Sequence, residues 1–148
     1  MNTKRALLLA VIAVIGALLL FISNDIKHPV LEQKVPVKKW ESKLNAEGAV
    51  VIEITPIKLS PKDREWKFEV VLNTHSVELD QDMAAISKLL DDKGNQYDLL
   101  YWQGDPPGGH HREVMLTFKP IIPTPKYIEL RILNVDVLVR SYVWDISG

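Results

Sequence analysis

Trp66-Lys67-Phe68-Glu69-Val70-Val71-Leu72 is the stretch that decides the fold. Apolar residues alternate with charged ones along most of it, so that Trp66, Phe68, Val70 and Leu72 fall on one side of an extended chain. Side chains of a β-strand point alternately to its two faces. The stretch therefore predicts a strand with one buried face and one face in water.

The same period of two recurs on both sides of this stretch. Further strands are predicted around residues 50–54, 86–90, 96–102, 114–118, 128–132 and 140–146. In the last, Arg140, Tyr142, Trp144 and Ile146 are expected to share one face, but the other face, with Val137, Val139 and Val143, is also apolar, so which face is buried stays open. The turn Asp91–Asn95 supplies Gly94 for a hairpin. Seven prolines from Pro56 to Pro125 are expected between strands, where a missing N–H is harmless.

These signals predict an immunoglobulin-like antiparallel β-sandwich of about seven strands. No long amphipathic helix separates the strands, which argues against a parallel α/β sheet. Two segments keep alternatives open. Residues 82–85 suit a helical turn or a strand equally, and residues 40–47 suit a short helix or a first edge strand.

The N-terminus predicts a membrane anchor. A short positive segment, residues 1–5, precedes 17 residues without charge, Ala6 to Ile22, which span roughly 25 Å as a helix. The alternative is a cleaved signal peptide, but bulky Phe21 lies where a cleavage site needs small residues. We expect a transmembrane signal anchor at residues 6–23, a tether at 24–48, and a domain at 49–147 outside the cytoplasm of a single-pass cell (inner) membrane protein.

Composition excludes several classes of function. The chain has no cysteine, so disulfides, thiolate zinc sites and cysteine nucleophiles are ruled out. Its net charge of −1 argues against a protein that binds nucleic acid through phosphate. No nucleophile elbow or phosphate-binding loop is present, so we do not expect an enzyme.

Three strings carry a resemblance to a known kind of domain: Asn73-Thr74-His75-Ser76-Val77, Pro106-Pro107-Gly108-Gly109-His110-His111-Arg112 and Arg140-Ser141-Tyr142-Val143-Trp144. Together they resemble a family of uncharacterised, membrane-anchored, immunoglobulin-like extracytoplasmic domains of prokaryotes. The resemblance covers about residues 49–147. It implies a sandwich outside the cytoplasm and brings no established activity.

Two segments of unusual composition, residues 73–82 and 104–112, are the candidate functional loops. They are expected to lie at one end of the sandwich. One hypothesis is a zinc or copper site, since imidazole and carboxylate bind such ions. Its candidate ligands are His75, His110 and His111, supported by Asp80, Asp82 or Asp105. His110 and His111 are adjacent, so both reach one ion only if the backbone bends at Gly108 and Gly109.

The alternative is that these residues fix the shape of the loops. Asn73, Thr74 and Ser76 are types that bond to nearby backbone, and a half-buried His75 would then lock the loops together. Arg112 would pair with Asp80, Asp82 or Asp105. Trp66 and Trp144 are expected in the core, whereas Trp102 is a candidate for an exposed aromatic lip.

The sequence thus predicts a non-enzymatic, membrane-anchored binding or accessory domain that uses the 73–82 and 104–112 loops, with Trp102, Gly108, Gly109 and Arg112 on a surface for a protein partner. Two alternatives are a zinc- or copper-binding accessory protein and a structural subunit of a membrane complex.

Overall fold

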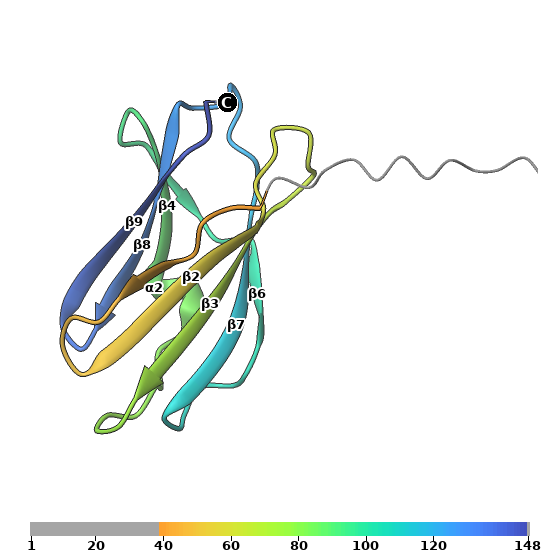
Figure 1. Ribbon diagram of the computed structural model, residues 1–148. Coiled ribbons are helices and arrows are strands. Elements are labelled where there is room, and N and C mark those ends of the chain that lie inside the picture. The colour runs from red at the N-terminus through yellow and green to blue at the C-terminus, as the bar shows by residue number, and fades with distance from the viewer. Residues whose placement is uncertain (1–38, 148) are drawn as a thin grey trace, which may run out of the picture. The chain divides into compact units, whose positions relative to one another are not determined.

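The computed structural model describes residues 39–147, and these form two packed antiparallel sheets (Figure 1). One sheet has the strand order β1-β2-β3-β7-β6 and the other β5-β4-β8-β9. The strands are β1 (Lys43–Asn45), β2 (Val50–Lys58), β3 (Trp66–Thr74), β4 (Ser87–Asp91), β5 (Gln96–Asp98), β6 (Tyr101–Gly104), β7 (His111–Phe118), β8 (Tyr127–Val135) and β9 (Leu138–Asp145). The prediction of an all-β antiparallel sandwich is confirmed.

The core lies between the sheets, where the alternation of the sequence places it. In β3, Trp66, Phe68, Val70 and Leu72 have no exposed surface. The rings of Phe68 and Phe118 meet edge to face with centroids 5.9 Å apart. The indole nitrogens also have partners: Trp66 Nε1 donates to the Ser60 carbonyl at 2.9 Å. The expectation that Trp66 and Trp144 belong to the core is confirmed.

Strand β9 was ambiguous in sequence because both of its faces carry apolar residues. In the structure Arg140, Tyr142 and Trp144 are buried, whereas Val139 and Val143 are exposed. The predicted sharing of one face by residues 140, 142, 144 and 146 is therefore confirmed. Tyr142 explains part of this choice, because its hydroxyl crosses the core and donates to the Ile52 carbonyl at 3.2 Å.

The hairpin predicted at Asp91–Asn95 is present between β4 and β5. Asp91 holds it: its carboxylate accepts from the Lys93 and Asn95 backbone N–H groups at 2.9 Å and from the Tyr97 hydroxyl at 3.0 Å. The Asn95 side chain also donates to this carboxylate and has the largest effect on it. Together these bonds lower the pKa of Asp91 to about 2. The carboxylate is thus kept ionised by the turn that it organises.

Three details differ from the sequence expectations, and two alternatives left open by the sequence are resolved, in favour of a helix at residues 83–86 and of an edge strand at β1. The single strand expected at 96–102 is two, since β5 and β6 lie in different sheets. Pro56 lies within β2, near a register shift between Pro56 and Lys58 that tolerates the missing donor. The short helix α2 (Met83–Ile86) precedes β4, so the ambiguous residues are helical. The folded unit also begins before residue 49, because β1 pairs with β2 and Trp40 packs on the core.

Residues 38–148 form a compact unit by themselves. The predicted positive segment (1–5), anchor (6–23) and most of the tether lie outside the described residues. Within residues 39–147, none of the helical structure has the length and apolar character that crossing a membrane requires.

Candidate functional site

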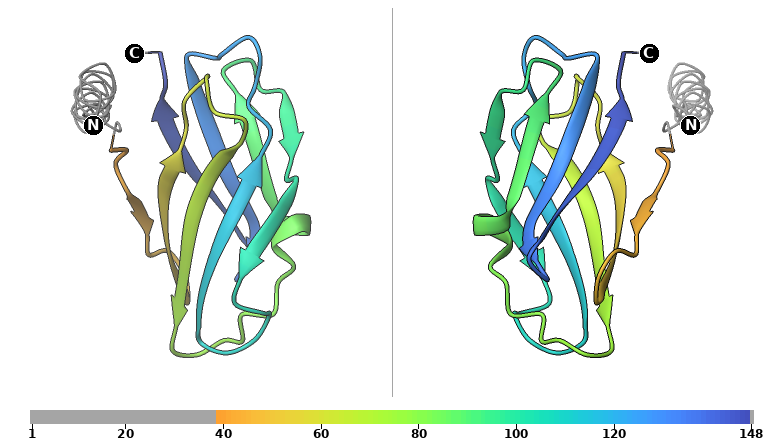
Figure 2. Two further views of the ribbon diagram at one scale, coloured as in Figure 1. Left: turned by 90° about the vertical axis from the view of Figure 1, so that its right-hand side faces the viewer. Right: turned by 90° about the vertical axis from the view of Figure 1, so that its left-hand side faces the viewer.

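The 73–82 and 104–112 loops emerge side by side because their strands are neighbours. β3 ends at Thr74, β7 begins at His111, and the two strands pair antiparallel with Asn73 opposite His111. Figure 2 shows both loops at the lower end of the domain. The expectation that the two loops share one end of the sandwich is confirmed.

Backbone pairing continues beyond the strands and joins the loops. The Thr74 N–H donates to the His110 carbonyl at 2.9 Å, and the Leu79 N–H donates to the Gly109 carbonyl at 3.0 Å. In return, the Gly108 N–H donates to the Leu79 carbonyl at 2.8 Å. Since these three bonds link one loop to the other, the two loops form one structure. We refer to residues 73–82 and 104–112 together as the joined loops.

Arg112 is the centre of the joined loops. It is completely buried, and Nη1 donates to the carbonyls of Leu79 at 3.1 Å and Gln81 at 2.9 Å. Nη2 donates to the Asp105 carbonyl at 3.3 Å. Burial lowers the pKa of Arg112, and the nearby Asp105, Asp80 and Asp82 charges raise it. The predicted pairing of Arg112 with these aspartates is thus corrected. The guanidinium donates to backbone carbonyls, and the carboxylates act on it only through longer-range electrostatic attraction.

Trp102 lies against this guanidinium and is not an exposed lip. The Arg112 Cζ atom is 5.5 Å from the centroid of the Trp102 ring, within the range of a cation–π contact. The ring is half-buried and packs on the hydrophobic core. The expectation of an exposed aromatic lip is therefore corrected, and whether Trp102 contacts a partner stays a prediction.

The three loop histidines lie at the surface. His75, His110 and His111 are all exposed, and a ring nitrogen of His111 is 2.6 Å from Asn73 Oδ1. Among residues 39–147, no three histidine, aspartate or glutamate side chains are grouped so that they could hold a metal ion. Because His75 is exposed, the expectation that a half-buried His75 locks the loops together is wrong.

Thr74 has the locking role instead. This buried side chain donates its hydroxyl to the Ala49 carbonyl at 2.8 Å, and it accepts from the Ser76 N–H at 3.3 Å and the Val77 N–H at 3.4 Å. A threonine is expected to bond to backbone within two or three residues in this way. The bond to Ala49, which is distant in sequence, ties the 73–82 loop to the start of β2. Sequence spacing alone does not reveal this bond.

Carboxylates form the outside of the joined loops. Three of them hold backbone N–H groups: Glu78 accepts from Gly109 at 2.7 Å, Asp82 from Ala84 at 3.0 Å and Asp105 from Glu113 at 2.9 Å. Asp80 is also exposed. The joined loops contain no lysine, and their single arginine is the buried Arg112. Their surface is therefore acidic.

The glycine with the closest backbone approach is Gly104, which the sequence analysis did not single out. Gly104 has φ +131°, and a Cβ there would lie 2.3 Å from the Glu113 carbonyl oxygen. Gly109 also has positive φ, but a Cβ there would meet nothing within 4 Å. Gly104 is thus required because another part of the backbone lies too close for a side chain. At Gly109 glycine is favoured only because φ is positive.

No protein-family model, no curated protein and no solved structure matches the chain.

Proposed function

We propose that the chain is a membrane-anchored, non-enzymatic binding protein whose extracytoplasmic domain is immunoglobulin-like. The strand order supports the fold proposal, because β2-β3-β7-β6 facing β9-β8-β4-β5 corresponds to strands A-B-E-D facing G-F-C-C′. The uncharged segment 6–23, preceded by Lys4 and Arg5, supports the anchor and the outside address.

The joined loops are the binding surface in this proposal. The single observation that carries it is that, within the joined loops, the one arginine is buried and four carboxylates are exposed. This guanidinium ties the backbone of both loops together, so the surface is formed before a partner arrives. Preformed surfaces bind with a smaller loss of conformational entropy. The four carboxylates are those of Glu78, Asp80, Asp82 and Asp105.

The chemistry of this surface selects a basic partner segment. Its carboxylates face solvent with no exposed lysine or arginine between them in the joined loops. At the opposite end, three basic residues, Lys58, Lys62 and Arg64, lie with two acidic ones, Asp63 and Glu65. Charge is therefore unevenly distributed along the domain. Such an arrangement steers a cationic polypeptide toward one end and accelerates its association.

A charge-reversal pair tests the proposal. Residues 38–148 are titrated with an oligolysine peptide at low and at high salt. Asp80→Lys reverses a charge on the joined loops, and Asp98→Lys reverses a charge on β5, where the Asp98 side chain is 84 % exposed and is paired with Lys88. We expect Asp80→Lys to weaken binding by roughly three- to tenfold at low salt, and Asp98→Lys to leave it nearly unchanged. Equal losses in the two variants would contradict the proposal.

A further inference from the structure

The four sheet edges of the domain are unequal. Three are short: β1 and β5 have three residues each and β6 has four. The fourth is β9, with eight residues, and among the described strands it pairs only with β8. Short edge strands limit pairing with another chain, whereas a long edge presents a row of free backbone donors and acceptors. The edge of β9 therefore needs an occupant or a cover.

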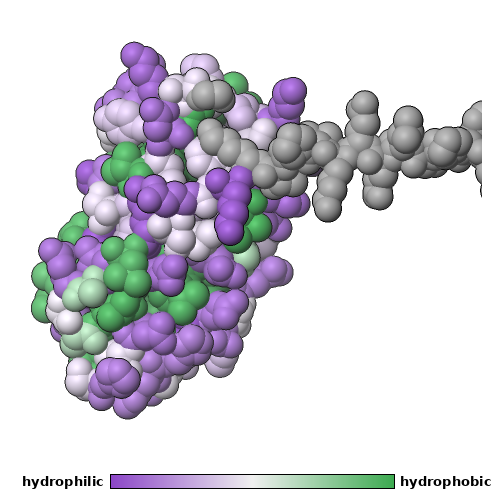
Figure 3. Space-filling view, in the orientation of Figure 1, coloured by the Kyte–Doolittle hydropathy of each residue, from purple (hydrophilic) through white to green (hydrophobic). Residues whose placement is uncertain are grey.

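The exposed face of β9 is apolar. Val139 is 58 % exposed and Val143 is 46 % exposed, with the smaller Ser141 between them. In Figure 3 apolar side chains gather on the lower left of the domain, in the region of β9 and β1. The strand carries no lysine and no proline, residues that natural edges use to prevent pairing, and its one inward-pointing charge, Arg140, is bonded to the Glu47 carbonyl of its own chain.

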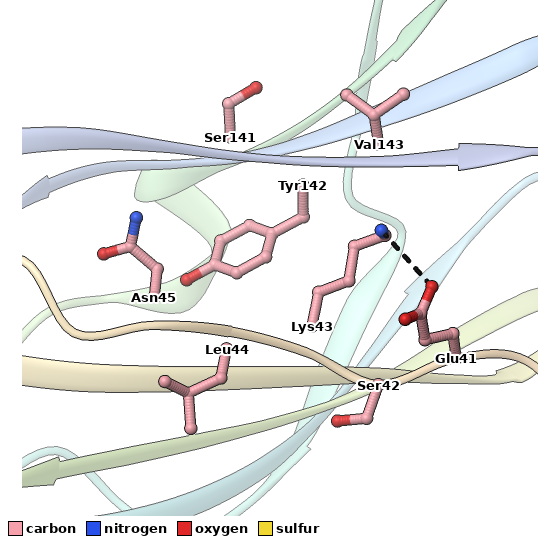
Figure 4. A pocket seen from close by; sticks show the side chains of 8 residues that line it. All are labelled: Glu41, Ser42, Lys43, Leu44, Asn45, Ser141, Tyr142 and Val143. Atoms are coloured by element: carbon pink, nitrogen blue, oxygen red, sulfur yellow. Dashed lines mark ion pairs between the residues drawn. The ribbon is translucent and has the colours of Figure 1, made fainter.

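Strand β1 lies beside β9 but does not pair with it: Trp144 Nε1 donates to the Glu41 carbonyl at 2.9 Å and Arg140 Nη2 donates to the Glu47 carbonyl. β1 belongs to the other sheet and pairs with β2. A groove separates it from β9 and is lined by residues 41–45 and 141–143. Figure 4 shows Lys43, Asn45 and Tyr142 between the two strands, with Lys43 turned toward Glu41 at 3.7 Å. Among residues 39–147, therefore, no backbone pairs with the outer edge of β9.

We propose that β9 pairs antiparallel with β9 of a second copy of this chain, about a two-fold axis at Ser141. This register places Val139 of each copy opposite Val143 of the other, on the exposed face. A register centred on Tyr142 would instead place Val139 opposite Asp145. Registers centred on Val139 or Val143 oppose one pair of valines, whereas the Ser141 register opposes two, and directly opposed side chains are the unit of cross-strand stabilisation.

A second copy is the occupant that the strand itself selects. The order Val139-Arg140-Ser141-Tyr142-Val143 is symmetric about its centre in size and polarity on the exposed face. Two-fold interfaces require such self-complementary surfaces, because each patch meets its own image. The pairing joins two four-stranded sheets into one of eight strands along roughly 27 Å of edge. This interface is separate from the joined loops.

The test is the mass in solution of residues 38–148, measured by sedimentation over a range of concentrations. Wild type is expected to dimerise. In Val139→Lys/Val143→Lys, lysines face lysines across the axis. We therefore expect the Kd of the dimer to rise by about tenfold or more. In the matched control Val139→Lys/Val143→Glu, lysine faces glutamate twice, so the dimer is expected to persist.

The control separates specific pairing from general apolar association. Both double variants remove the same two valines, so loss of nonspecific contact would make both monomeric. Mixing the double-lysine variant with Val139→Glu/Val143→Glu should restore a dimer, which also demonstrates that the lysine variant is folded. A monomeric wild type overturns the proposal, as does a Val139→Lys/Val143→Glu protein that is as monomeric as the double-lysine variant.

Discussion

The guanidinium of Arg112 lies over the ring of Trp102, with 5.5 Å between Cζ and the ring centroid. Arg112 comes from β7 and Trp102 from the neighbouring strand β6. The ring covers one face of the guanidinium, while its N–H groups reach the carbonyls of Leu79, Gln81 and Asp105. A planar, multiply donating cation is needed for both contacts at once. Arg112 is thus one side chain that links both loops to β6, in addition to the backbone bonds between the loops.

Arg112→Lys should destabilise the domain by about 2–4 kcal/mol. Lysine keeps the charge, but it cannot reach three carbonyls with fixed geometry, and buried acceptors are left without donors. The measurement is the free energy of unfolding of residues 38–148 in urea. Arg131→Lys is the control: Arg131 pairs with Glu129 at the surface, so its loss should stay below about 0.5 kcal/mol. Similar losses in the two variants would mean that Arg112 does not hold the loops.

Alanine substitutions at two glycines should differ in cost. Gly104→Ala is expected to cost about 3 kcal/mol, because the new Cβ would meet the Glu113 carbonyl oxygen at 2.3 Å. Gly109→Ala should cost about 1 kcal/mol, from the positive φ alone. Urea unfolding of both variants gives the comparison. A Gly109 variant that is the less stable of the two would show that the close approach at Gly104 is relieved without cost.

Asp91→Asn should lower stability at neutral pH but not in strong acid. Folding lowers the pKa of Asp91 from 3.8 to about 2, mainly through its bond from Asn95. A depressed folded pKa gives stability that is complete above pH 3.8 and is lost as the pH falls toward 2. The difference in thermal midpoint between wild type and variant should therefore be constant down to about pH 4 and then shrink. A difference that does not change with pH would contradict this account.

The histidines should contribute little to stability. His75, His110 and His111 are exposed, so a variant with alanine at all three should lose less than about 1 kcal/mol. Zinc and cupric ions, titrated calorimetrically into residues 38–148, are expected to produce no heat that depends on these side chains. Micromolar binding that disappears in the triple variant would restore the metal-site hypothesis.

Local pattern predicted the strands because period two depends only on neighbouring residues and a buried face. The stretch from Trp66 to Leu72 and the turn at Gly94 each carry their own signal. The division of residues 96–104 into β5 and β6 carries no local signal of this kind. Only Leu99 and Leu100 separate the two strands, and both are apolar like the strand residues around them. Which sheet a short strand joins depends on long-range pairing.

The site was predictable in place but not in detail. Composition marked the two loops, and antiparallel neighbours bring them to one end. The sequence did not assign Arg112 to the interior, because arginine is normally exposed unless its donors are satisfied. Here three carbonyls from distant parts of the loops accept from its Nη1 and Nη2 atoms. The three histidines suggested a metal site from their residue type alone. Their exposure depends on the folded conformation of the loops, which the spacing of residues in the sequence does not determine.

Amide hydrogen exchange of residues 38–148, followed at single residues, tests the central claim that the joined loops are one preformed structure. In wild type, the amides of Thr74, Leu79 and Gly108, which donate from one loop to the other, should be protected like those of β3 and β7. In Arg112→Lys these three amides should exchange much faster while the amide of Val70, in the middle of β3, stays protected. Fast exchange of the three amides in wild type would contradict the account.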